Sequence, residues 1–240
     1  MKNKLPAAPY LVWMIVFILV PLIMVAYFAF TDKDGHFTLD YVSNVAQYTP
    51  IFVRSIWLAL ISTVICLLIA YPLAYILIGM NTNIQSTMLM IVMLPMWMNF
   101  LLRTYAWMAL LGNNGLINAL LGLVGLGPFK MLNTEGAVVL GMVYNYLPFM
   151  ILPIYSVMVK IDKSVLEAAA DLGCNPAKTM LKVVFPLSLP GVFSGITMVF
   201  VPAISTFIIS RMLGGGGNLL IGDIIEMQFL GNSYNINLGA

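Results

Sequence analysis

Two polar residues that could contact a solute stand inside an otherwise hydrophobic stretch of this sequence. Asn99 and Arg103 are four residues apart within residues 88–111, so a helix would place both side chains on one face. An ionisable residue within a membrane span usually faces the protein interior or a water-filled path. Because Arg103 lies toward one end of the stretch, snorkelling of its guanidinium to the lipid headgroups is the alternative.

The sequence offers no comparable set of groups for catalysis. It contains no glycine-rich nucleotide-binding loop with Lys, no His-x-x-x-His pair and no Ser, His and Asp set in the hydrophobic stretches. One histidine and two separated cysteines predict neither a metal site nor a disulfide. We therefore expect a protein that is not an enzyme, with no catalytic residues and no cofactor of its own. A net charge of +2 gives no indication of a nucleic-acid partner.

The composition indicates a membrane protein. Hydrophobic residues make up 61% of the chain and the mean hydropathy is +0.98, whereas a soluble domain has about 45 to 50% apolar residues. A helical span needs about 20 mostly apolar residues. Five stretches qualify, and they are residues 10–30, 56–78, 88–111, 137–159 and 191–209. The expected fold is an all-α integral membrane protein, a polytopic helical bundle that forms one domain over residues 1–240 and is surrounded by membrane lipid.

Basic residues predict the orientation of the chain, because Lys and Arg are more frequent in cytoplasmic loops. Five spans place six basic residues on the side of the N-terminus and four on the other side. The first group is Lys2, Lys4, Lys160, Lys163, Lys178 and Lys182, and the second is Lys33, Arg54, Lys130 and Arg211. We expect a cytoplasmic N-terminus, a cytoplasmic loop at residues 160–186 and an external segment at residues 211–240, with a short helix over residues 219–230.

The cytoplasmic loop is unusually polar for this chain. Seven of the twenty Asp, Glu, Lys and Arg residues lie between Lys160 and Lys182. Ser164-x-x-Glu167 predicts a capping box at a helix start, and Gly173 predicts its end. Asn175-Pro176 predicts a second short helix that lasts until Phe185-Pro186. A membrane protein that concentrates charge in one helical loop is expected to offer that loop to a soluble partner.

The first of these two helices has a small apolar stripe. Val165, Ala169 and Leu172 follow one another at i, i+4 and i+7, a spacing that fits insertion into a groove of a partner. The alternative is an amphipathic helix at the membrane surface whose charges are solvated.

Glu167-Ala168-Ala169, with Gly173 six residues after the Glu and Phe185-Pro186 downstream, resembles the cytoplasmic EAA loop of ABC-transporter permeases of the binding-protein-dependent importer class. In that class the first short helix is the coupling helix, which sits in a groove of the ATP-hydrolysing subunit. The resemblance implies that this contact is made by Glu167, Ala168, Ala169, Leu172 and Gly173.

Further segments resemble the first permease subunit of spermidine/putrescine importers. They are Ala70 to Ala74, Pro95 to Tyr105, Leu166 to Gly173, Asn218 to Gly222 and Gln228 to Leu230. The resemblance implies a bacterial inner-membrane protein with six spans, a second permease subunit, two ABC ATPase subunits that use ATP and Mg, and an extracellular binding protein that delivers the polyamine. Because a sixth hydrophobic stretch is absent, we expect the sequence to be truncated before a final span.

A polyamine is a polycation, for which carboxylates and aromatic faces are suitable partners; cation–π attraction contributes about 0.5 to 2 kcal/mol. The candidate pathway residues are Trp97, Asn99, Arg103, Tyr105, Trp107, Asp223 and Glu226. Arg103 would repel a cation, which leaves open an importer of inorganic or carboxylate anions. A non-transporting membrane scaffold that docks a cytoplasmic partner is the alternative from another class.

Overall fold

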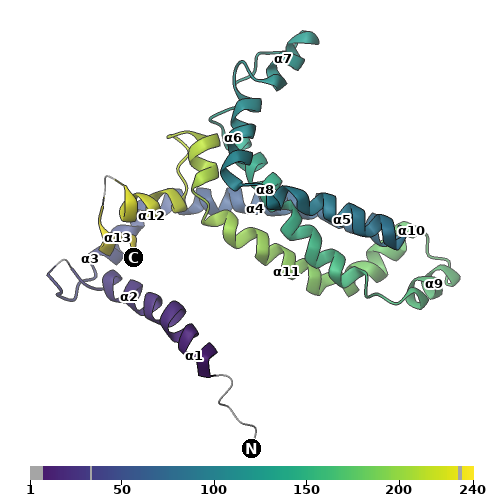
Figure 1. The fold of residues 1–240 in the computed structure, drawn as a ribbon, viewed down its shortest axis with the longest axis horizontal. Helices are drawn as coiled ribbons and strands as arrows, with labels where there is room; N and C mark the ends of the chain where they lie inside the picture. The colour runs from purple at the N-terminus through teal and green to yellow at the C-terminus, as the bar shows by residue number, and fades with distance from the viewer. Residues whose placement is uncertain (1–7, 33, 232–233) are drawn as a thin grey trace, which may run out of the picture.

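The computed structural model describes residues 8–32, 34–231 and 234–240, and within these ranges the protein is helical with no strand. Three long helices form the core: α4 (Thr49–Ile78), α8 (Glu135–Met158) and α11 (Phe185–Ile204). They pack against one another along the long axis of the molecule, with α5 (Thr82–Trp97) beside them (Figure 1). The predicted all-α bundle is confirmed.

Small side chains allow the three core helices to approach closely, as is typical of helix packing in membranes. Ala59, Ala70 and Ala74 of α4 are fully buried. On α11, a Cβ added at Gly191 would lie 2.8 Å from the carbonyl oxygen of Pro153 on α8. A hydrogen bond of 3.1 Å between the hydroxyls of Tyr71 and Ser188 joins α4 to α11 inside the core.

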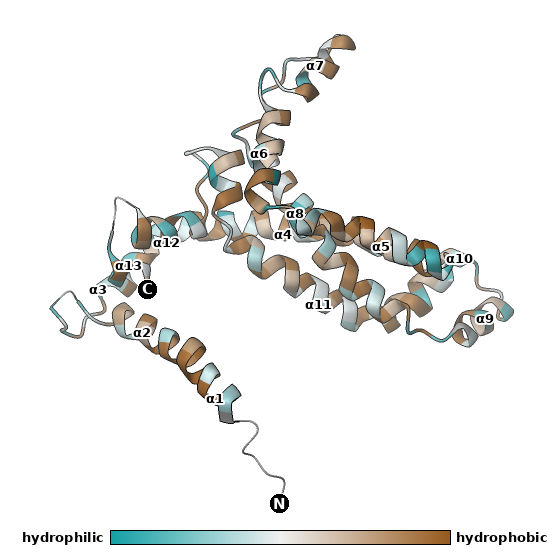
Figure 2. Ribbon diagram, in the orientation of Figure 1, coloured by the Kyte–Doolittle hydropathy of each residue, from teal (hydrophilic) through white to brown (hydrophobic). Residues whose placement is uncertain are grey.

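Five helices of the described chain are long and apolar enough to cross a membrane. The first is a nearly continuous rod made of α1 (Ala8–Met14), a π-helical segment (Ile15–Leu19) and α2 (Val20–Ala29). Its most apolar window has no buried residue, and Figure 1 shows it standing apart from the core helices. Figure 2 shows hydrophobic residues along α2 and α5 and more hydrophilic loops at the ends of the molecule.

The third predicted span, residues 88–111, is wrong as a single helix. The chain forms α5 up to Trp97, leaves the helical conformation at Met98 and Asn99, and restarts as α6 (Phe100–Leu111). The Asn99 side chain caps the new helix by accepting from the backbone N–H groups of Leu101 at 2.8 Å and Leu102 at 3.4 Å. Pro95 also weakens the end of α5, because it cannot donate a helical hydrogen bond.

The helix that follows Asn175 does not end at Phe185-Pro186 as predicted. Helix α10 (Pro176–Thr179) continues through a π-helical segment, η4 (Met180–Val184), into α11. Pro186 lies in the first turn of α11, where the missing N–H of proline is tolerated. The fifth span therefore extends from Pro176 to Ile204 and begins earlier than the predicted residues 191–209.

The remaining helices lie at the two ends of the core or project from it. They are α3 (Asp40–Asn44) with the 3-10 segment η3 (Val45–Tyr48), α7 (Leu116–Leu123), α9 (Lys163–Asp171), α12 (Ile221–Leu230) and α13 (Ile236–Gly239). Figure 1 shows α9 at one end of the core and α12 near the other. The short helix predicted at residues 219–230 is confirmed as α12. Among the basic residues used to predict orientation, Lys2, Lys4 and Lys33 lie outside the described residues.

Candidate coupling helix and solute pathway

The helix that carries the Glu-Ala-Ala motif is α9, and its start differs from the predicted capping box. The N-cap is Asp162, whose side chain accepts a 3.1 Å hydrogen bond from the backbone N–H of Ser164. Because the helix begins at Lys163, Ser164 is already its second residue and Glu167 lies beyond the first turn. An Asp carboxylate is at least as good an N-cap acceptor as a Ser hydroxyl, and here it takes that position.

The end of α9 agrees with the prediction. Gly173 has a positive φ of 76°, and its N–H donates to the carbonyl of Ala170 at 2.9 Å. The N–H of Cys174 donates to the carbonyl of Ala169 at 3.0 Å, which completes a Schellman motif. The next helix starts as predicted, with the Asn175 side chain accepting from the N–H of Lys178 at 2.8 Å.

The exposed face of α9 is not the predicted apolar stripe. Leu172 is 85% exposed and Val165 is 39% exposed, but Ala169 is only 6% exposed. Ala169 therefore faces the protein, and Ala168 takes its place on the exposed side, together with Glu167. The exposed residues of α9 include Val165, Glu167, Ala168 and Leu172, and we call these four residues together the α9 face.

The inner side of α9 contacts the ends of the core helices. Leu166 packs against the buried cluster that includes Leu77 and Met158, and it lines a cavity of about 490 Å³ between α9, α8 and the α4–α5 turn. Gln85 holds that turn by donating to the carbonyl of Met80 at 2.8 Å. It also accepts from the Tyr155 hydroxyl on α8 at 3.1 Å. These contacts link α9 to the ends of two core helices, α4 and α8.

Asn99 and Arg103, predicted to share one helical face, have different roles in the structure. Asn99 stands before α6 and uses its side chain as the cap described above. Arg103 is 8% exposed, and its Cζ lies 5.9 Å from the ring centroid of Phe100 and 6.0 Å from that of Tyr144. Its Nε and Nη1 have no hydrogen-bond partner in the described part of the chain. Burial against two rings favours the interior position over snorkelling.

The three aromatic candidates also differ in environment. Trp97, at the end of α5, is 77% exposed, and Tyr105 is 53% exposed. Trp107 is half-buried and packs edge-on against Tyr144, with 5.4 Å between ring centroids and 71° between ring planes. Trp97 is therefore the aromatic side chain with the largest free surface among these three.

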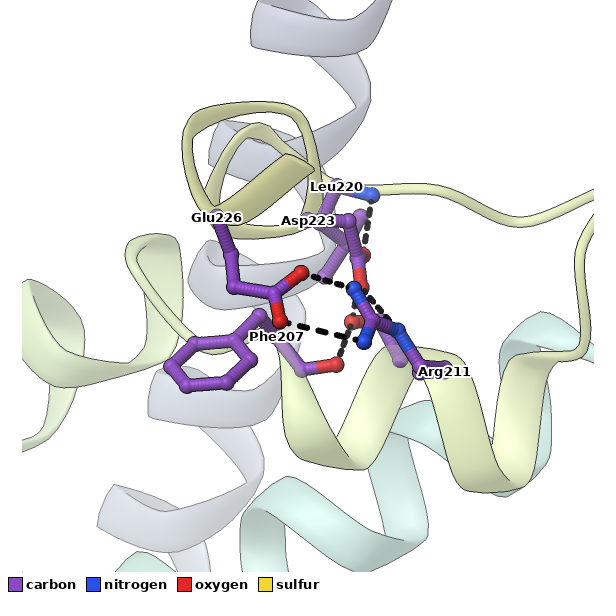
Figure 3. A network of polar contacts seen from close by, with 6 residues as sticks. Phe207, Arg211, Leu220, Asp223 and Glu226 are labelled. Carbon is purple, nitrogen blue, oxygen red and sulfur yellow. Dashed lines mark hydrogen bonds and ion pairs between the residues drawn. The ribbon is translucent and has the colours of Figure 1, made fainter. Parts of the chain in front are cut away.

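The two carboxylate candidates lie on α12 and share one arginine, Arg211 (Figure 3). Arg211 belongs to the π-helical segment η5 (Ser210–Gly214). Its Nη1 donates to Oε1 of Glu226 at 3.3 Å, and its Nη2 bonds to Oε2 of the same carboxylate. Its Nε lies 3.8 Å from Oδ1 of Asp223.

Asp223 is fully buried and is also the side chain that fixes the start of α12. Its Oδ2 accepts from the Ser210 hydroxyl at 2.6 Å and from the backbone N–H of Leu220 at 2.8 Å. Burial raises the pKa of Asp223, while these two hydrogen bonds and Arg211 act in the opposite direction. The hydrogen bond from Arg211 lowers the pKa of Glu226.

Sequence reasoning missed Ser210, Arg211 and Tyr144 as partners of the candidate residues. Asp223 and Glu226 are three residues apart and share a helical face, which is a visible signal for a common cation. The fold identifies that cation, because it brings Arg211 of η5 to the two carboxylates of α12. The segment η5 also packs against α6. The structure therefore separates the predicted pathway residues into an α5–α6 group and an α12 group, with η5 between them.

These features define a class of protein. Five helices of the described chain are long and apolar enough to cross a membrane, and a capped helix with exposed apolar and acidic residues lies at one end of the bundle; these features define a polytopic helical membrane protein. The chain belongs to the family described as binding-protein-dependent transport system inner membrane component, whose model matches residues 7–238. The family resemblance stated from the sequence is confirmed.

Curated relatives agree with this assignment. The chain is 38% identical over 238 residues to the spermidine/putrescine transport system permease protein PotB of Haemophilus influenzae, covering 95% of this chain and 83% of that protein. It is 35% identical over 228 residues to the protein of the same name from Escherichia coli K12, covering 91% of this chain and 83% of the relative.

Solved structures share the fold. A bacterial ABC transporter involved in the import of the acidic polysaccharide alginate contains a chain with a TM-score of 0.76 at 15% identity, covering 96% of this chain and 85% of that chain. A second structure shows the alginate transporter with a periplasmic protein bound to an alginate pentasaccharide; its TM-score is 0.70 at 17% identity, and the match covers 96% of this chain and 84% of that one.

Proposed function

We propose that this chain is the membrane-spanning subunit of an ABC importer that moves polyamines, spermidine or putrescine, into a bacterial cell. The observation that carries the substrate assignment is the similarity to spermidine/putrescine permeases over more than nine tenths of this chain. The energy comes from ATP, which is hydrolysed with Mg by two ABC ATPase subunits. A second permease subunit completes the path, and an extracellular binding protein delivers the solute.

The arrangement of α9 supports coupling to the ATPase. The α9 face presents Leu172 and Val165 for a groove and Glu167 for a charged partner, while the inner side contacts α8 and the α4–α5 turn. The segment that begins at Pro176 continues into α11 as one span. A displacement of α9 by the ATPase subunit therefore moves α8 and α11, which pack against each other.

The pathway follows from the charges of the α5–α6 and α12 groups. Asp223 and Glu226 supply negative charge, and Trp97 supplies an open aromatic face for an ammonium group. Asn99, Tyr105 and Trp107 shape the wall of the path near α6. Arg103 is buried against Phe100 and Tyr144. Its positive charge near the path limits the affinity of the path for a cation, and tight binding is left to the binding protein.

Trp97→Ala tests this pathway. Loss of one cation–π contact of about 0.5 to 2 kcal/mol should lower spermidine uptake about 2-fold to 30-fold, and Asp223→Asn should act in the same direction. Trp57→Ala is the matched control, since Trp57 is 60% exposed on α4 and is not one of the candidate pathway residues. Uptake of labelled spermidine by proteoliposomes gives the result. Equal uptake by the Trp97 and Trp57 variants would remove Trp97 from the path.

We also propose that the N-terminus and Cys174 are cytoplasmic and that Gly214 to Gly217 are external. The excess of basic residues on the side of α9 supports this orientation. In intact spheroplasts, a membrane-impermeant thiol reagent should label a cysteine introduced at Gly216 and leave Cys174 unlabelled. Labelling of Cys174 without labelling at position 216 would reverse the orientation.

A further inference from the structure

Two carboxylates on α12 form a site for a cation, and the Arg211 guanidinium of the same chain occupies it. We call this site the Arg211 cluster; it consists of Ser210, Arg211, Asp223 and Glu226. One guanidinium faces both carboxylates, with two hydrogen bonds to Glu226 and a longer ion pair to Asp223 (Figure 3). A guanidinium and an alkylammonium are both cations that donate N–H groups. The same pair of carboxylates therefore suits either of them.

The site is incomplete on the Asp223 side. Oδ1 of this fully buried carboxylate has no hydrogen-bond partner in the described chain, and its distance of 3.8 Å from Arg211 Nε exceeds hydrogen-bond range. A buried carboxylate oxygen without a donor is costly. An incoming donor that reaches Oδ1 would recover an interaction that Arg211 does not make.

Arg211 lies at the exposed side of the cluster. Its side chain is 47% exposed and that of Glu226 is 21% exposed, so solvent screens their ion pair and reduces its strength. The flexible stem of an arginine allows the guanidinium to move into solvent while the backbone of η5 stays in place. Arg211 and Glu226 therefore form the exposed side of the cluster, from which a solute would approach the buried Asp223.

We propose that Arg211 is a resident cation which a primary ammonium group of the transported polyamine replaces at Asp223 and Glu226. The ammonium donates to Oδ1 of Asp223 and to the Glu226 carboxylate, and the guanidinium turns outward. This inference rests on the proposed polyamine substrate. It assigns to Arg211 a role that none of the predicted pathway residues has: it keeps the carboxylates paired while no solute is present.

Arginine modification by phenylglyoxal, read by peptide mass spectrometry on the assembled wild-type transporter, tests the exchange. Spermidine delivered by the binding protein should accelerate modification of Arg211 by up to about fivefold, the factor that corresponds to loss of one partly exposed ion pair. Arg54 is the internal control, because its side chain is 37% exposed, forms an ion pair with Glu135 at 2.7 Å and lies outside the cluster. Choline at equal ionic strength has no N–H donor and should change neither rate.

Glu226→Gln should raise the modification rate of Arg211 without spermidine and reduce the further increase with it. An unchanged Arg211 rate in a complex that accumulates spermidine would overturn the exchange and leave the proposed function intact. The same acceleration by choline would show that charge alone acts and would contradict the ammonium site. Absence of spermidine uptake by the wild-type complex would overturn the proposed function, and this inference with it.

Discussion

Replacement of Gly173 by valine is expected to remove most ATP-driven uptake while the transporter still assembles in the membrane. Gly173 ends α9 with a φ of 76°, and a left-handed conformation costs an L-residue about 1 to 2 kcal/mol, more for a β-branched one. A Cβ at this position would meet nothing within 4 Å, so the effect comes from the backbone. We expect loss of the Schellman motif to change the orientation of the α9 face and thereby to disrupt the proposed contact with the ATPase subunit.

Proteoliposomes that contain the whole complex give the measurement: spermidine uptake should fall about tenfold, the effect of roughly 1.4 kcal/mol, while basal ATP hydrolysis remains. Gly122→Val is the matched control, because Gly122 of α7 has open space and no positive φ. Glu167→Lys, which reverses a charge on the α9 face, should uncouple uptake in the same way. Undiminished uptake in both the Gly173 and Glu167 variants would refute docking through α9.

The second large effect is expected for Gly191→Val, which overpacks the contact between α11 and α8. A Cβ at Gly191 would lie 2.8 Å from the Pro153 carbonyl oxygen and 3.1 Å from the Cα of Ile154. Both are backbone atoms, so the helices must separate, and overpacking of this kind costs about 1 to 3 kcal/mol. Thermal unfolding in detergent should therefore begin at a clearly lower temperature than for the wild type.

Ser194→Val is the control for that experiment, since Ser194 is exposed on the same helix and exposed substitutions usually change stability by less than about 0.5 kcal/mol. If the two variants unfold at the same temperature, close contact between α8 and α11 does not hold the core together. The coupling route from α9 through these two helices would then lose its structural basis.

Much of the fold was predictable because membrane spans have a strong local signal. Long apolar stretches indicated the bundle. Gly173 and Asn175-Pro176 indicated the bend after α9, because each of these residues acts on the backbone conformation at its own position. The break at Met98 and Asn99 was missed because the hydrophobic run continues through it and only the side chain of Asn99 marks the new helix start. Pro186 was predicted to end a helix, but the π-helical segment before it places this proline in the first turn of α11.

The candidate sites were predictable in part, for the same reason. The helices α9 and α12 were expected from the sequence, but the direction of Ala169 depends on the core that packs beneath α9. The ion pairs of Arg211 with Asp223 and Glu226 connect η5 to α12. They depend on how residues 205–220 fold, and no local sequence pattern predicts them. The burial of Arg103 likewise depends on Tyr144, which lies on another helix.

The most direct test of the account is stimulation of ATP hydrolysis in the reconstituted complex by a panel of solutes. Each solute is supplied with the cognate binding protein, and the panel contains spermidine, putrescine, sulfate and amino acids. We expect spermidine or putrescine to stimulate hydrolysis and the other solutes to have no effect. Stimulation by sulfate without any effect of a polyamine would contradict the account. It would make Arg103, whose buried Nε and Nη1 have no hydrogen-bond partner in the described residues, the better indicator of the substrate.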